Sequence, residues 1–147
     1  MNPQPAPSFS PRLIGQTEKA LNAILARELD GTGLSEPGWV LLKLAQAAGG
    51  RLGRQELVVQ AQAAAKFDRQ RTEAEIESLL SADLLAAEGS VVVLTDDARA
   101  LQARVGSSVD EITGQLWGDL SDADLATAGR LLATVLGRAN EELGYSI

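Results

Sequence analysis

One short β-branched stretch, SVVVL at residues 90–94, interrupts a chain whose other apolar residues recur at helical spacing. Valine side chains pack well on a pleated backbone, so the three valines predict a strand. The strand follows a Gly89-Ser90 turn signal and leads to Thr95, a residue suited to capping a helix. Because an isolated hairpin is marginal in water, the strand needs a further partner, for which residues 50–52 are the candidate.

The segments on either side of this strand have the periodicity of amphipathic helices. Ser35 and Ser121 each precede such a segment and are predicted to be N-caps. The glycine-containing stretch at residues 31–33 ends the first helical segment, and Gly49-Gly50 ends the second. Spacings of three and four between apolar residues predict six helices, at residues 12–30, 36–48, 54–65, 67–85, 96–117 and 122–143.

The composition excludes several classes of site. The chain of 147 residues contains no cysteine and no histidine, so disulfides, Cys/His zinc sites and catalysis by imidazole are excluded. Phosphate-loop and nucleophile motifs are absent from the sequence, and the aspartates at helix starts are explained by capping. We therefore expect no enzyme, no cofactor and no metal site.

The N-terminal segment, MNPQPAPSFSPR, has three prolines before Ser8 and no apolar core, which is unlike a signal peptide or a membrane span. It predicts a flexible arm over residues 1–11 of a cytoplasmic protein that does not enter a membrane. The rest of the chain, residues 12–147, is expected to form one domain, because its length is typical of a single core.

The order of these elements indicates the fold class: mainly α with a small β-hairpin wing. Three short helices followed by a ribbon form a winged helix-turn-helix over residues 34–97. The helices at residues 12–30 and 98–147 carry apolar stripes that a small three-helix core cannot bury, so they are predicted to be dimerisation helices of a twofold homodimer. The alternative is that the long helices fold back on their own core as a monomeric bundle.

Three passages also carry a family resemblance, from about Leu13 to Leu143. They are LARELDGTGLSEPGWVLLKLA, then ESLLSADLLAAEGSVVVLTDDARALQARV, then LWGDLSDADLATAGRLLATVLGRANEEL. In this order and spacing they resemble the MarR family of bacterial transcriptional regulators. The resemblance implies a homodimer that binds a pseudo-palindromic site on double-stranded DNA, usually as a repressor. It also implies that a small phenolic or lipophilic ligand often causes release by entering a cleft between the dimerisation and DNA-binding regions. Trp39 either bounds this cleft or fills the core.

The candidate DNA contacts cluster between the second and fourth predicted helices. The whole chain has a net charge of −7, so attraction to phosphates must come from a local group of cations. Arginine can read guanine and glutamine adenine, while small side chains allow a helix to approach the groove floor. The predicted DNA-binding residues are Arg51, Arg54, Lys66, Arg69, Gln70, Arg71, Ala74 and Ser78.

Two features depart from this pattern. The wing tip at Glu88, Gly89 and Ser90 lacks the positive charge that is common in the family, and the fourth helix is acidic. The arginines could instead pair with Asp68, Glu73 and Glu75 on a solvated surface. A degenerate winged-helix protein that binds other proteins rather than an operator is therefore the alternative function.

Overall fold

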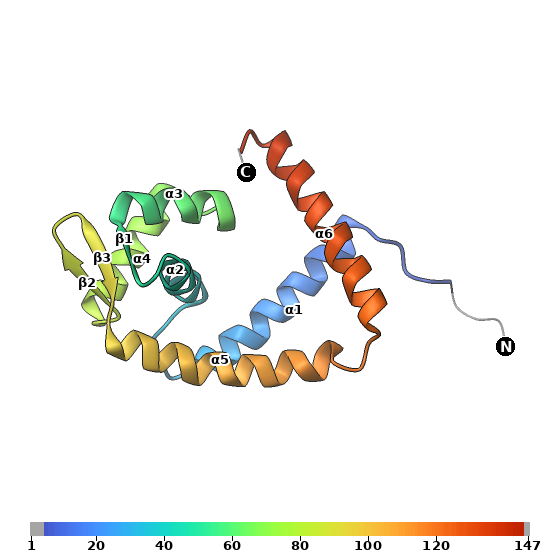
Figure 1. Ribbon diagram of the computed structural model, residues 1–147, viewed down its shortest axis with the longest axis horizontal. Coiled ribbons are helices and arrows are strands. Elements are labelled where there is room, and N and C mark those ends of the chain that lie inside the picture. The colour runs from blue at the N-terminus through green and yellow to red at the C-terminus, as the bar shows by residue number, and fades with distance from the viewer. Residues whose placement is uncertain (1–4, 146–147) are drawn as a thin grey trace.

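The computed structural model describes residues 5–145. Residues 1–4 of the predicted arm, and the last two residues of the predicted dimerisation region, lie outside this range. Six helices and three strands follow one another along residues 5–145 (Figure 1). They are α1 (Pro11–Leu29), α2 (Glu36–Ala47), β1 (Arg51–Gly53), α3 (Arg54–Ala65), α4 (Arg69–Ser81), β2 (Leu85–Glu88), β3 (Val91–Leu94), α5 (Asp96–Trp117) and α6 (Asp122–Glu142).

Side-chain caps define where most of these helices begin. The hydroxyls of Ser35, Thr95 and Ser121 each accept a hydrogen bond from the backbone N–H three residues later, at 3.0–3.1 Å. These bonds satisfy one of the donors left free at a helix start, and the three predicted caps are confirmed. Helix α3 has Gly53 at its N-cap and no side-chain cap, because β1 runs directly into it.

The sheet confirms the predicted strand and adds to it. Its order is β1-β3-β2 and both pairings are antiparallel, with Leu52 opposite Val92 and Leu85 opposite Leu94. The prediction that the fourth helix continues to residue 85 was wrong. Helix α4 ends at Ser81, Asp83 takes a positive φ of 58° that stops the helix, and Leu85 opens β2.

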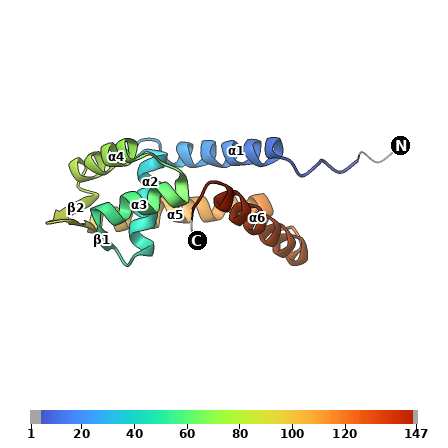
Figure 2. The ribbon, with the colours of Figure 1, turned by 90° about the horizontal axis from the view of Figure 1, so that it is seen from above.

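The hydrophobic core lies inside the winged head formed by α2, α3, α4, the sheet and the first half of α5. It contains only aliphatic side chains and one tryptophan, Trp39, among its buried apolar members. Helix α5 runs out of this head, and α6 turns back from its far end (Figure 1). Viewed at 90°, α1 and α4 lie along one side of the molecule (Figure 2). No helix among residues 5–145 is long and apolar enough to cross a membrane.

Gln102 is the one polar side chain of the described chain that is buried without any hydrogen bond partner. It lies on α5, is 5% exposed, and neither Nε2 nor Oε1 has a partner among the described residues. Burying an amide without hydrogen-bond partners lowers the free energy of unfolding, and replacing the amide by an apolar group recovers this loss.

We therefore expect Gln102→Met, which keeps the length of the side chain, to raise the free energy of unfolding by about 1–2 kcal/mol. Urea denaturation measures this change. The exposed Gln70→Met is the control and should change stability by less than about 0.5 kcal/mol. Loss of stability in Gln102→Met would mean that a polar partner holds the amide.

Candidate nucleic-acid interface

Helices α3 and α4 form the helix-turn-helix, and the turn between them is three residues long. Lys66 ends α3 in the left-handed conformation with φ 59°, which turns the chain sharply. Asp68 then caps α4, since its carboxylate accepts the backbone N–H of Arg71 at 2.7 Å. Phe67, between them, packs partly against the core. The turn thus leaves the N-terminus of α4 exposed. In helix-turn-helix proteins the N-terminal residues of the second helix are the ones that contact base edges of DNA.

Helix α4 has one buried and one exposed side. Thr72, Ile76 and Leu79 are buried against the head. The opposite side is exposed and small or polar, as the sequence predicts, and it carries Gln70, Arg71, Ala74 and Ser78. Beyond Arg71 this face carries the small side chains of Ala74 and Ser78, so this part of α4 can approach a flat or grooved surface closely.

Two of the five predicted cations pair with carboxylates of the same head. Arg51 on β1 forms an ion pair with Glu88 at the wing. Arg54 at the start of α3 reaches across to α4, where it binds Glu73 and Glu77, each at 2.7 Å. The hydrogen bonds that the Arg54 guanidinium donates to Glu77 and then to Glu73 raise its pKa. The Arg54 pairs tie α3 to α4, and all three pairs lower the positive charge on this side of the head.

The other three cations differ among themselves. Lys66 is exposed and binds the end of α6, with Nζ 2.6 Å from Oδ1 of Asn140. Arg69 and Arg71 take part in none of the ion pairs formed within residues 5–145. The guanidinium carbon of Arg71 lies 5.0 Å from the ring centroid of Phe67, a cation–π contact that orients it. The predicted cluster therefore has two unpaired cations at the N-terminus of α4.

The carboxylates of α4 have structural partners of their own. Glu75 accepts a hydrogen bond from the Ser35 hydroxyl at 3.0 Å, which ties α4 to the start of α2, and Asp68 is the cap of α4. The alternative pairing expected from the sequence is thus confirmed for Glu73 alone. Glu77 and Glu88 are the other partners of the head's arginines.

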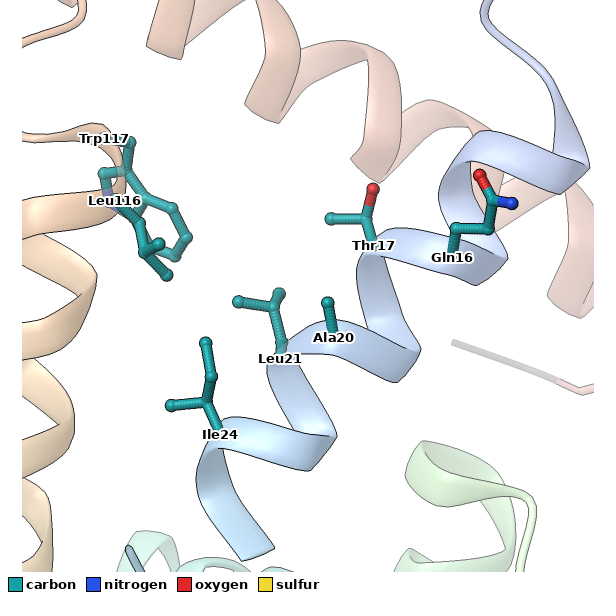
Figure 3. A pocket seen from close by; sticks show the side chains of 7 residues that line it. All are labelled: Gln16, Thr17, Ala20, Leu21, Ile24, Leu116 and Trp117. Atoms are coloured by element: carbon teal, nitrogen blue, oxygen red, sulfur yellow. The ribbon is translucent and has the colours of Figure 1, made fainter. Parts of the chain in front are cut away.

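A groove of about 430 Å³ lies away from this interface, between α1 and the end of α5. Figure 3 shows Leu116 and Trp117 on one side and Leu21 and Ile24 of α1 on the other. Trp39, for which the sequence left a ligand cleft and the core open, is 8% exposed and belongs to the core. The indole that lines a groove is that of Trp117.

Solved structures share this arrangement of elements. The structure of a MarR family transcriptional regulator from Silicibacter pomeroyi has a TM-score of 0.76 at 22% identity, over 90% of both chains. The reduced form of MarR from E. coli has a TM-score of 0.68 at 19% identity, over 90% of this chain and 96% of that one. The chain has the MarR fold.

A third MarR-fold comparison is CouR from Rhodococcus jostii, solved with bound p-coumaroyl-CoA. Its TM-score is 0.70 at 16% identity, over 84% of this chain and 88% of that one. By sequence alone, this chain matches no family model and no curated protein.

Within the MarR fold of this chain, sequence reasoning missed two features of the head and its surroundings. The ion pairs of Arg54 with Glu73 and Glu77 could have been predicted in part, because the two carboxylates lie four residues apart and so share one face of α4. Nothing in the sequence indicated the contact of Lys66 with Asn140, since 74 residues separate them.

Proposed function

We propose that the protein is a homodimeric, DNA-binding transcriptional regulator of the cytoplasm that represses its target. The observation that carries the proposal is the exposed N-terminal half of α4, with Arg69, Gln70 and Arg71 held outward by the Asp68 cap. This half presents a small, polar face with two unpaired cations. The likeness to MarR-fold regulators supports the same use of α4.

The apolar side chains that the single chain leaves exposed support the homodimer. Large apolar residues at the start of α1, at the end of α5 and along α6 stand in solvent when one chain is considered alone. A second copy covers them in a twofold arrangement without any further sequence requirement. These residues are Leu13, Leu116, Trp117, Leu120, Leu131, Leu132, Val135, Leu136 and Leu143.

In the proposed complex each α4 enters a major groove of the DNA. Arg71 and Gln70 face base edges, Ala74 and Ser78 allow close approach, and Arg69 contacts a phosphate. Arg51, Arg54 and Lys66 take a secondary part, because carboxylates or Asn140 already hold them. The number of phosphate contacts is therefore small.

Arg71→Ala should weaken binding to DNA from upstream of the protein's own reading frame by about 30-fold or more, since it removes one bidentate contact of roughly 1–3 kcal/mol from each of two protomers. Mobility shifts at low and moderate salt measure it. Glu77→Gln is the matched variant and should strengthen binding, because it removes a carboxylate beside the groove face and loosens its hold on Arg54. Equal affinities of wild type and both variants would contradict the proposed interface.

The salt dependence of DNA binding by the wild-type protein tests the number of phosphate contacts, independently of the variants. Arg69 in two protomers gives two phosphate contacts, for which log K falls with log salt at a slope of about −2. If all five predicted cations of each protomer took part, the slope would be about −9. Absence of any shift at low salt would contradict DNA binding itself.

Release by a small phenolic or lipophilic ligand completes the proposal. Its support is the structure of CouR with p-coumaroyl-CoA, a phenolic thioester. A cleft at Trp39 would require movement of the core, because the indole is buried there.

The alternative, a winged-helix module that binds another protein, is favoured by one observation. The ion pairs of Arg51 and Arg54 leave more carboxylates than free cations on the head. Such a module would bind a basic partner. A protein that remains folded and dimeric, yet shifts no DNA at low salt and binds a polylysine-type peptide, would favour this alternative.

A further inference from the structure

Helix α6 makes almost no apolar contact with its own head. Its contact with the head is made by one polar residue. Of the described residues of α6, only Asn140 is buried, with 9% of its surface exposed. The leucines of the same helix, such as Leu132 and Leu136, are exposed. The contact between α6 and the head is therefore made by an amide side chain at the end of the helix.

Asn140 is buried because Lys66 of the head binds it. The ammonium of Lys66 donates to Oδ1 of Asn140 at 2.6 Å and to the backbone carbonyl of Ala63. Lys66 is the left-handed residue that ends α3, so its side chain leaves the helix-turn-helix just before the recognition helix begins. The bond joins the turn of the head to the far end of α6.

The chain after α6 adds a third group to this contact. Gly144 has a φ of +81°, which turns the chain back, and the N–H of Tyr145 donates to the carbonyl of Asn140 at 2.8 Å. The Tyr145 ring is thereby placed with its centroid 4.3 Å from Nζ of Lys66. A cation–π contact at this distance is favourable.

These contacts occupy the ammonium of Lys66. An ammonium has three N–H donors, and two oxygens and an aromatic face surround this one. Charge-assisted hydrogen bonds are stronger than those between neutral groups, so a single lysine can hold two elements in one orientation. A hinge is available at the other end, where α5 and α6 meet at residues 118–121.

We propose that Lys66, Asn140 and Tyr145 form a clasp that holds the winged head at a set angle to α6. The clasp acts within one protomer and needs neither DNA nor ligand. Its consequence rests on the proposed function: in the homodimer, the angle of each head to α6 determines how far apart the two α4 helices lie. Lys66 then serves as a positioning residue rather than as a phosphate contact.

The test is a distance measurement inside one protomer. The chain contains no cysteine, so Ser81→Cys on α4 and Thr134→Cys on α6 provide two unique and exposed sites for spin labels. Doubly labelled protein is co-refolded with a large excess of unlabelled protein, so that each dimer carries one labelled protomer. Pulsed dipolar spectroscopy then reports the distribution of distances between head and α6, whether or not the protein binds DNA.

We expect a narrow distribution in the wild-type background. Lys66→Gly and Asn140→Leu should at least double its width, and both variants should fold. Glycine adopts the positive φ of position 66 without strain, and leucine favours the helix more than asparagine does. Asn140→Asp keeps an acceptor oxygen and should stay narrow. The proposal is overturned if the distributions of Lys66→Gly and wild type superimpose, or if Asn140→Asp broadens as much as Asn140→Leu.

Discussion

Ile76→Ala should lower the free energy of unfolding by about 2–5 kcal/mol, which is a large share of the stability of a small domain. Ile76 lies on the inner side of α4 and is completely buried, so the deletion leaves a cavity in addition to the lost transfer free energy. The residue holds the recognition helix against the core. Under the proposed function its truncation should therefore also weaken DNA binding, through loss of the folded head rather than of a contact.

Urea denaturation at one fixed protein concentration measures this effect, because the apparent stability of a dimer depends on concentration. Ile76→Val should cost about 0.5–1.5 kcal/mol, and Ser78→Ala on the exposed side of the same helix less than about 0.5 kcal/mol. Equal losses for Ile76→Ala and Ser78→Ala would contradict the assignment of the inner and outer faces of α4.

Leu136→Glu should convert the homodimer into monomers. Leu136 is 59% exposed in the single chain and lies on the apolar stripe of α6. In the proposed dimer the variant places two unpaired carboxylates in an apolar interface, each at a cost of several kcal/mol. We expect the dissociation constant to rise by at least about a thousandfold, which corresponds to about 4 kcal/mol.

Sedimentation velocity over a range of concentrations measures the dissociation. Thr134→Glu is the matched control: it adds the same charge two positions away, about 200° around the helix, on the polar side. That variant should remain dimeric. A Leu136→Glu protein that sediments as a dimer would exclude α6 from the interface, and the exposed leucines would then need another explanation.

The sequence was sufficient for the order and type of the elements because the signals for them are local. Hydroxyl caps at Ser35, Thr95 and Ser121 satisfy backbone donors only three residues away, and the valines of β3 favour a strand wherever they lie. The end of α4 was placed too late, because Leu84 and Leu85 continue an apolar pattern that a helix and a buried strand share.

The sequence also predicted which side of α4 is exposed, because helical periodicity separates Ile76 and Leu79 from Gln70, Ala74 and Ser78. Whether each nearby cation is free to meet a phosphate was decided by tertiary structure. Arg54 and Glu77 are 23 residues apart, and only the packing of α3 on α4 brings them together.

The amino-acid sequence by itself thus determined the helices, the strand, the caps and the apolar stripes, since each depends on neighbours within about one helical turn. Only the tertiary structure decided which charged side chains are paired and which remain free. An ion pair or a hydrogen-bonded ammonium depends on distances of a few ångströms between segments such as residue 66 and residue 140, and no spacing along the chain encodes those distances.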